Sequence, residues 1–413
     1  MMTSDFIFYL IVGLILADFL FDLYVSLLNA KHFNDPVPEI LSDVYDDKEY
    51  EKSQAYKRQQ LYFGLINSGF SLLLILSFIF LNGFEWLHHF SSSQFDHPIL
   101  ISLVFFGVLF GASFIINLPF SYYQTFVIEE KFGFNRSTKK VFWLDQLKSI
   151  ALTIIVGGLV LALINWFYLL LADNFWWLAW LFTAIIIVFM NLFYSKLIVP
   201  IFNKLKPLEE GDLRHKIEVY AEKEDFNLDK INVIDGSKRS SKANAYFSGF
   251  GSQKQVTLYD TLIEKLTPDE VVAVLAHEVG HYKKKHIIFN LMMALITTGL
   301  TFYILSFFII SPIISQALGV EEPNFHIGLI AFSFIYAPVN TILGILTNII
   351  SRKFEYQADN FAKETFSGTY LMNALKKLSR DSLSNLTPHS LNVFLNYSHP
   401  SLLQRFRNLR QNV

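Results

Sequence analysis

Hydrophobic residues in this chain gather into seven long runs, at about 6–28, 61–81, 99–121, 148–171, 175–195, 287–315 and 327–350. Each run is close to the roughly 20 apolar residues with which a helix crosses the hydrocarbon core of a bilayer. Asn, Pro and Gly interrupt the last two runs, which membrane helices tolerate better than soluble helices do. The pattern therefore predicts seven membrane-spanning helices.

The positions of the Lys and Arg residues test this layout, because positive residues concentrate on the cytosolic side of membrane proteins. All 34 of them lie in the connections 29–59, 122–148 and 196–285 or after residue 350. The N-terminus and the connections around 82–98, 172–174 and 316–326 have none. Buried helices of a large soluble protein would not sort their charges in this way. We expect the N-terminus outside and the C-terminus in the cytosol.

Composition narrows the chemistry that this chain can perform. Charged residues make up 17% of its 413 residues, below the roughly 25% of a soluble domain. A net charge of −2 argues against a nucleic-acid partner. The chain has no cysteine, so a metal site must use His, Asp and Glu. Eukaryotic chains of this length seldom lack cysteine, which favours a bacterial inner membrane over the endoplasmic reticulum membrane as the location.

Four portions follow from these boundaries: membrane helices in 1–195 and 287–350, and cytosolic portions in 196–286 and 351–413. The first cytosolic portion contains two short β-branched runs, Lys230–Ile234 and Gln255–Tyr259, which predict strands. The expected fold is mainly α: a polytopic membrane protein of seven helices with a small cytosolic α+β portion.

The sequence after residue 266 carries the signals of a helix N-terminus. Thr267 is the expected N-cap, Pro268 occupies the first helical position, and Glu270 completes a capping box.

This helix carries His277-Glu278-Val-Gly-His281. Two histidines four residues apart share one face of a helix, so both imidazoles can bind one ion. Zinc favours such ligands and keeps an open position for water in catalytic sites. Glu278, next to the first ligand, can take a proton from that water. The spacing predicts one catalytic Zn²⁺ per chain, with Glu278 as the base.

Topology narrows the search for a third protein ligand. Glu321 and Glu322 fall on the outer side and cannot reach a cytosolic metal. Glu355 and Asp359 follow the seventh span, one helical turn apart, where the helix leaves the membrane on the same side as the histidines. We therefore expect Glu355 to be the third ligand. Asp359 can accept a hydrogen bond from a ligand imidazole and fix its tautomer.

Taken together, these motifs resemble the Ste24 family of integral membrane zinc proteases, the CAAX prenyl protease 1 type of M48 peptidases. The resemblance covers nearly the whole chain and rests on the seven spans and on these segments: Leu275–His281, Glu355–Asp359, Glu130–Asn135, Ser241–Tyr246 and Tyr397–Pro400.

The resemblance implies a barrel of seven helices around a water-filled chamber, and a gluzincin-like zinc site facing the interior near the cytosolic side. The family's characteristic substrates are membrane-associated, prenylated proteins with C-terminal CaaX sequences. Carried over to this chain, Asn244 resembles the residue that binds substrate backbone from an edge strand. His399 and Arg405 fall where the family places groups that support the zinc site and its transition state, and His399 could donate to a developing oxyanion.

Two alternatives remain open from the sequence. Bacteria generally lack protein prenylation, so quality-control proteolysis of membrane proteins is one alternative, although the related heat-shock proteases have fewer spans. The other is a metal transporter, for which ionisable residues are expected at mid-span, and Asp18 and Asp22 are the clear candidates. His286 is expected to extend its side chain towards the membrane surface. Glu130–Asn135 is expected to form a turn around Gly133.

Overall fold

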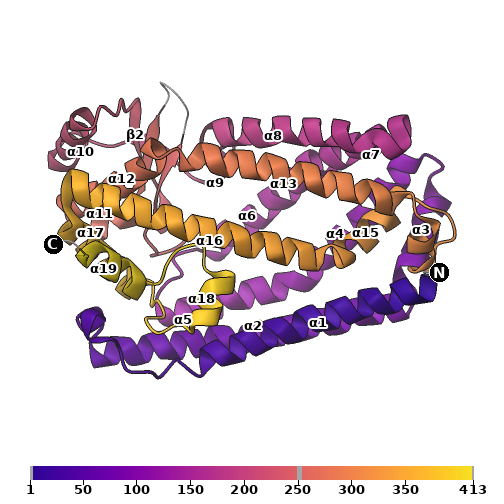
Figure 1. The fold of residues 1–413 in the computed structure, drawn as a ribbon, viewed down its shortest axis with the longest axis horizontal. Coiled ribbons are helices and arrows are strands. Elements are labelled where there is room, and N and C mark those ends of the chain that lie inside the picture. Colours follow the sequence, from indigo (N-terminus) through magenta and orange to yellow (C-terminus); the bar gives the residue numbers. More distant parts are fainter. Residues whose placement is uncertain (1–2, 249–253, 412–413) are drawn as a thin grey trace.

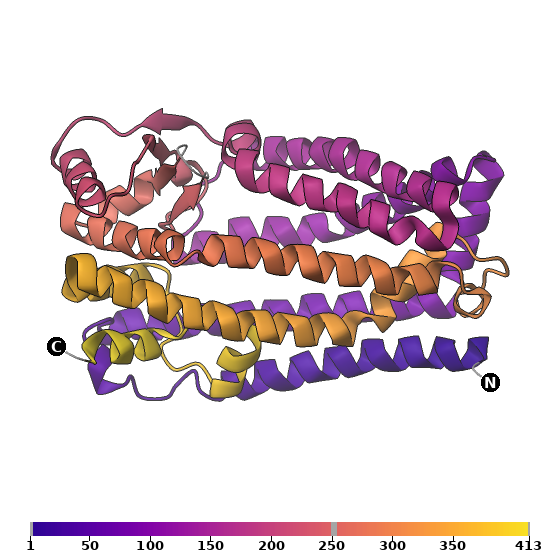
Figure 2. The same ribbon diagram turned by 45° about the horizontal axis from the view of Figure 1, so that its top comes forward.

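The structure is a computed structural model that describes residues 3–248 and 254–411. Long helices run side by side along most of the molecule, and the sheet lies at the end that also holds the C-terminus (Figure 1). The N-terminus lies at the opposite end (Figure 2). This arrangement agrees with the expected polytopic helical fold.

Within residues 3–204, the regular elements are helices and helical turns. Their bounds are α1 Ser4–Ala30, α2 Asp47–Phe80, α3 Gly83–Gln94, α4 Pro98–Tyr123, α5 Glu130–Phe132, α6 Lys139–Leu152, α7 Gly158–Leu171, α8 Phe175–Leu197 and α9 Val199–Phe202, with π-helical turns at Gln124–Glu129 and Thr153–Gly157 and 3-10 turns at Glu39–Leu41 and Ala172–Asn174.

The second half adds a small sheet. Its elements are β1 Leu205–Pro207, α10 Asp212–Lys223, β2 Lys230–Ile234, a 3-10 turn at Gly236–Lys238, β3 Ala245–Ser248, β4 Gln255–Tyr259, α11 Asp260–Lys265, α12 Pro268–Lys283, α13 His286–Ile309, α14 Pro312–Gln316, α15 Phe325–Ile335, α16 Ala337–Ala362, a π-helical turn at Lys363–Ser367, α17 Gly368–Asp381, α18 Ser390–Asn396 and α19 Leu402–Arg410.

Among the described residues, six helical segments are long and apolar enough to cross a membrane, and a seventh counts if a bent pair is one span. The bent pair is α15 and α16, which meet at 56°. Pro338 lies in the first turn of α16, where its missing N–H costs no helical bond. The single span expected over 327–350 is therefore two helices. The apolar windows of the six spans are only 0–17% buried inside the protein, as lipid-facing helices should be.

The sheet has the order β1-β2-β4-β3. Strands β2 and β4 coincide with the two predicted runs and pair in parallel, while β1 and β3 join them in antiparallel fashion. Because β3 pairs only with β4 within this order, β3 is an edge strand.

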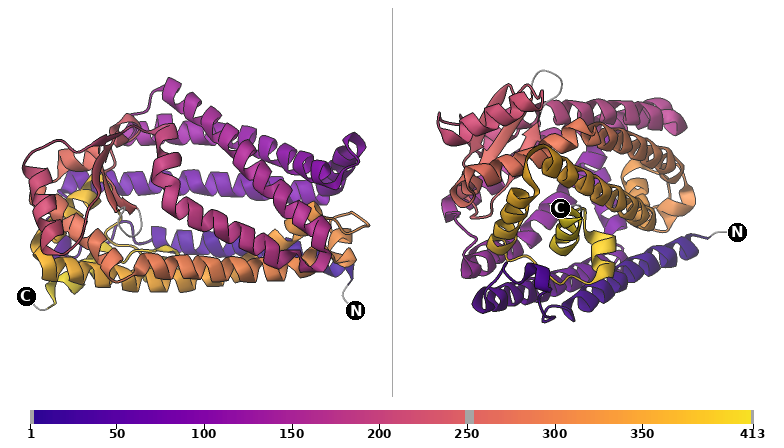
Figure 3. Two further views of the ribbon diagram at one scale, coloured as in Figure 1. Left: turned by 90° about the horizontal axis from the view of Figure 1, so that it is seen from above. Right: turned by 60° about the vertical axis from the view of Figure 1, so that its left-hand side comes forward.

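The two cytosolic portions share one hydrophobic core. This core is formed by buried residues of β4, α12, α16, α17 and α19. Its members include Val256 and Leu258 of β4 and Val272 and Leu275 of α12. Figure 3 shows the sheet and these helices gathered at one end of the long helices. The chain before α13 and the chain after α16 thus pack as one unit, which places α12 beside α16.

Candidate metal centre

Helix α12 begins as the sequence predicts. The Thr267 side chain accepts a hydrogen bond from the backbone N–H of Glu270, and the Glu270 carboxylate accepts one from the backbone N–H of Thr267, at 2.8 Å. With its start fixed, the helix places His277 and His281 one turn apart on one face. Their Nε2 atoms lie 3.2 Å apart.

A glycine lets α16 approach this face of α12. A Cβ atom at Gly280 would lie 3.1 Å from the Cα atom of Ala358 and 3.1 Å from the Cβ atom of Phe361. Contacts this short are rare for a real Cβ atom, so a side chain at Gly280 would push the helices apart. The residue between the two metal-binding positions of the motif therefore sets how closely Glu355 can approach them.

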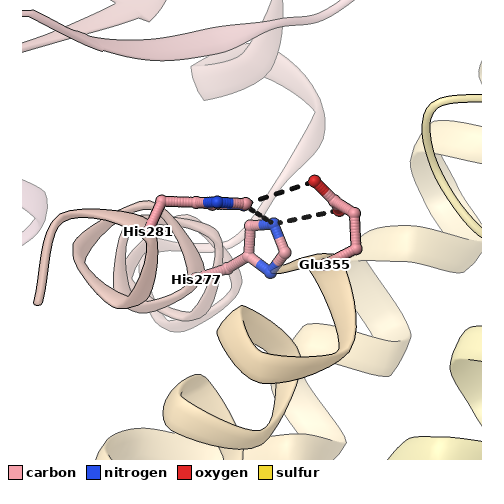
Figure 4. A group of neighbouring side chains, drawn as sticks. All are labelled: His277, His281 and Glu355. Carbon is pink, nitrogen blue, oxygen red and sulfur yellow. Dashed lines mark hydrogen bonds and ion pairs between the residues drawn. The ribbon is translucent and has the colours of Figure 1, made fainter. Parts of the chain in front are cut away.

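Glu355 of α16 points between the two histidines (Figure 4). Its Oε2 atom lies 3.4 Å from Nε2 of His277, and its Oε1 atom lies 3.3 Å from Nε2 of His281. One ligand atom from each of the three residues falls within 4.8 Å of the others. The side chain of Glu355 is only 4% exposed. The structure therefore brings the three predicted ligands together.

The donor atoms fit a metal ion. The Oε2 atom of Glu355 is buried, and ring nitrogens of His277 and His399 lie 3.4 and 2.9 Å from it; imidazole nitrogen and carboxylate oxygen are the ligand atoms that zinc favours. Burial lowers the pKa of His277, but hydrogen bonds to Asp359 and Glu355 outweigh it and raise the pKa to about 9. The cluster thus favours positive charge at its centre, which a divalent cation would supply.

Asp359 and Arg405 form a second layer around His277. Nδ1 of His277 lies 2.9 Å from Oδ1 of Asp359. Arg405 donates two hydrogen bonds to the same carboxylate, at 2.9 and 2.5 Å. Burial lowers the pKa of Arg405, but the carboxylates of Asp359 and Glu355 outweigh it and raise the pKa. Arg405 therefore stays charged, and Asp359 can hold the Nδ1 proton of His277.

His399 reaches the cluster from the segment after α18. Its Nδ1 atom lies 2.9 Å from Oε2 of Glu355, and 64% of its side chain is exposed. A histidine in this position touches the predicted third ligand on one side and solvent on the other. Glu278 lies on α12 next to His277 and is partly buried. Both side chains remain accessible to a substrate.

Asn244 lies apart from the cluster, directly before the edge strand β3. Its backbone carbonyl accepts a hydrogen bond from the N–H of Tyr259, at 3.0 Å. Its side-chain oxygen accepts one from the N–H of Ala245, at 2.9 Å. The side chain is exposed at the start of the strand, where an extended peptide could pair with it.

The predicted turn at Glu130–Asn135 supports the segment that leads to Asn244. Gly133 has a positive φ of 85°, a conformation that glycine adopts without strain. The Phe134 carbonyl accepts a hydrogen bond from the N–H of Ser241, at 3.0 Å. Lys242 forms an ion pair with Glu129 at 2.8 Å. The turn has a structural role that the sequence did not reveal.

The expectation for His286 is wrong. Its side chain does not extend towards the membrane surface; the residue is only 2% exposed. Lys285 has a positive φ of 62°, which separates α12 from α13 and turns His286 back towards the cluster. Its Nδ1 atom lies 3.1 Å from Nδ1 of His281. Helical periodicity could not reveal this contact, because the helix breaks between the two residues.

Comparison with known proteins covers almost the entire chain. The family described as CAAX prenyl protease N-terminal, five membrane helices, matches residues 26–204, and Peptidase family M48 matches residues 207–413. CAAX prenyl protease 1 of Saccharomyces cerevisiae is 32% identical, over 96% of this chain and 93% of its own length. The Arabidopsis thaliana homologue is 34% identical, over 96% of each chain. The chain belongs to peptidase family M48.

A solved structure agrees with this assignment. The crystal structure of S. mikatae Ste24p matches with a TM-score of 0.93 at 32% identity, covering 98% of this chain and 99% of that chain. This chain is therefore a Ste24-type membrane metalloprotease, a multi-pass integral membrane protein that acts on peptide or protein substrates at a membrane. The family implies a metal, and His277, His281 and Glu355 form the candidate metal-binding group found among the described residues.

Proposed function

We propose that this chain is a zinc endopeptidase in which His277, His281 and Glu355 hold one Zn²⁺. The observation that carries the proposal is the convergence of these three side chains from α12 and α16 on one point, within 4.8 Å. Two His and one Glu are the protein ligands of a well-known class of catalytic zinc sites, and they leave a position for water. A transporter would need its metal ligands along the spans, whereas this group lies where α12 meets the end of α16.

The surrounding residues supply the rest of the chemistry. Zinc, when bound, supplies Lewis acidity and lowers the pKa of water to near neutrality. Glu278 takes a proton from the attacking water and passes it to the amine that leaves. His399 donates a hydrogen bond to the oxygen that gains charge from the scissile carbonyl. Asp359, held by Arg405, accepts the Nδ1 proton of His277 and keeps its Nε2 atom free for the metal.

Substrate binding is proposed at the edge strand. An extended peptide that pairs with β3 would gain main-chain hydrogen bonds, and Asn244 lies at the start of that strand. The cavity among α1, α2 and α15 holds about 850 Å³ and reaches Asn396, three residues before His399. We propose that this cavity takes the part of the substrate chain that extends beyond the metal centre.

We infer that the substrates end in CaaX sequences, because relatives that match over 88–96% of their own length are named CAAX prenyl proteases. The purified, zinc-loaded protein should be given matched peptides ending in CaaX, with and without a farnesyl group, and a third with an internal copy of the same sequence. We expect release of the terminal tripeptide from the farnesylated peptide. Mass spectrometry that finds internal cleavage of all three alike would favour quality-control proteolysis.

We propose that the N-terminus lies outside and the sheet end in the cytosol, because every Lys and Arg falls on connections of one side. In this cysteine-free chain, Ser93→Cys and Lys238→Cys introduce single labels at exposed positions near opposite ends of the helices. An impermeant thiol reagent added outside intact cells should label only the variant at position 93. Labelling of both variants would contradict the orientation. The lack of cysteine supports a bacterial inner membrane as the location.

A further inference from the structure

We propose that His286 and Gln357 are positioning residues that hold His281 in the one tautomer able to bind the metal. The inference deepens the proposed zinc site and rests on it. It concerns two residues outside the ligand set: His286 opens α13, and Gln357 lies on α16 two positions after Glu355. Together they form a hydrogen-bonded chain that ends on His281.

This hydrogen-bonded chain links three side chains in the order Gln357, His286, His281. Nε2 of His286 lies 2.8 Å from the side-chain oxygen Oε1 of Gln357. Nδ1 of His286 lies 3.1 Å from Nδ1 of His281. The ring of His286 stacks on Phe354, with the centroids 4.0 Å apart and the planes at 10°. The ring therefore cannot turn freely, and both of its nitrogen atoms have fixed partners.

The amide oxygen decides where each proton lies. A carbonyl oxygen only accepts, so Nε2 of His286 must carry its proton. The neutral imidazole then has a bare Nδ1, which accepts the proton that Nδ1 of His281 donates. His281 is left with a lone pair on Nε2. That atom is the one that faces Nε2 of His277, at 3.2 Å, and Oε1 of Glu355, at 3.3 Å.

If the hydrogen bonds ran in the opposite direction, His281 could not bind the metal. If Gln357 offered its NH₂ group, Nε2 of His286 would have to accept, and the proton of His286 would sit on Nδ1. His281 would then have to accept at Nδ1 and carry its proton on Nε2, pointing at the metal position. A single side-chain amide thus selects between a binding and a non-binding form of a residue that it does not touch.

The two histidines of the motif therefore reach the same tautomer by different means. His277 donates its Nδ1 proton towards a buried carboxylate, Asp359, which Arg405 neutralises. His281 donates towards a neutral imidazole backed by an amide. This relay therefore orients His281 through a neutral ring and an amide.

Four variants test the relay through metal affinity, measured by competition with a chelator and without any peptide substrate. Gln357→Leu removes the acceptor, and His286→Phe keeps the stack on Phe354 while removing both nitrogen atoms. Each should weaken zinc binding about 10- to 100-fold, the usual effect of losing a group that orients a metal ligand. Gln357→Glu keeps an acceptor oxygen, and His286→Asn places an amide oxygen near the position of Nδ1. Both should stay within about threefold of the unaltered protein.

If His286 had only a structural role, the variants would show a different order of zinc affinities. In that case His286→Asn, which loses the stack on Phe354, would weaken binding more than His286→Phe, and this result would overturn the relay. Thermal unfolding of the metal-free proteins checks that all four variants fold. His215→Phe, on the exposed face of α10, controls for the loss of a surface histidine. If the unaltered protein itself binds no zinc, the proposed zinc site fails; if all variants bind equally, only the relay fails.

Discussion

The metal cluster and the cavity among α1, α2 and α15 are both polar regions of a largely apolar chain, and they are built in opposite ways. In the cluster, the side chains of Glu355 and Asp359 are 4% and 0% exposed, and each has positively charged or imidazole neighbours within 3 Å. In the cavity, Asp18 and Asp22 line an open space of about 850 Å³ and are exposed.

The difference shows where chemistry can be performed. A buried carboxylate is stable only with partners, so those partners hold it in one geometry. The cluster therefore has the fixed arrangement that catalysis needs, whereas the cavity has room for a chain and for water. In a metal transporter, the ionisable groups with fixed partners would lie at mid-span, in the cavity, and not at the end of the helices. Substitutions in the two regions should accordingly differ widely in effect.

The largest effect is expected from Glu355→Ala. It removes one of three proposed ligands and leaves the imidazoles of His277 and His281 without the third. Metal binding should weaken more than the 10- to 100-fold that is typical of outer partners, with cleavage lost in parallel. Glu364→Ala, at an exposed position on the next turns of the chain, is the control. Elemental analysis that finds full zinc content in Glu355→Ala would remove this residue from the ligand set.

His399→Ala should reduce turnover by about 10²- to 10³-fold, the cost of removing one oxyanion donor. Its side chain is 64% exposed, so the fold should tolerate the change. Zinc content should stay near that of the unaltered protein, and kcat should fall more than KM changes. A loss of zinc equal to that of Glu355→Ala would instead make His399 part of the metal site.

Asp359→Asn should weaken zinc binding about 10- to 100-fold. The amide keeps the shape of the carboxylate but loses the charge that Arg405 and His277 share. Because Asp359 is fully buried, thermal unfolding must accompany the chelator titration. Equal zinc affinity in a folded variant would contradict the role of Asp359 in orienting His277.

The smallest effect is expected in the cavity. Exposed substitutions usually change stability by no more than about 0.5 kcal/mol, and the carboxylates of Asp18 and Asp22 have no place in the proposed chemistry. The double variant Asp18→Asn/Asp22→Asn should keep its zinc and cleave a short peptide at a rate within about twofold of the original. Loss of zinc here would revive the transporter alternative.

Local signals predicted the parts of the site that lie on regular elements. The capping residues of α12, strands β2 and β4, and the apolar spans all follow from patterns of period or composition. The residue pattern alone does not predict the short edge strands β1 and β3, because three or four residues carry no readable alternation, and only the family resemblance implied an edge strand at Asn244. The contact of His286 with His281 depends on the turn at Lys285. The segment before Asn244 is held by bonds from Ser241 and Lys242 to residues more than a hundred positions earlier in the sequence.

The central claim is that Glu278 performs the proton transfers at a metal held by other residues. Glu278→Gln keeps the size of the side chain and cannot accept a proton, and general acid–base help is worth about 10²- to 10⁴-fold. Glu264→Gln, at an exposed position on α11, is the matched control. Zinc content and peptide cleavage should be measured on the same preparation of each protein. We predict full zinc content in both variants and nearly complete loss of cleavage in Glu278→Gln alone. Near-normal cleavage by Glu278→Gln would contradict the account.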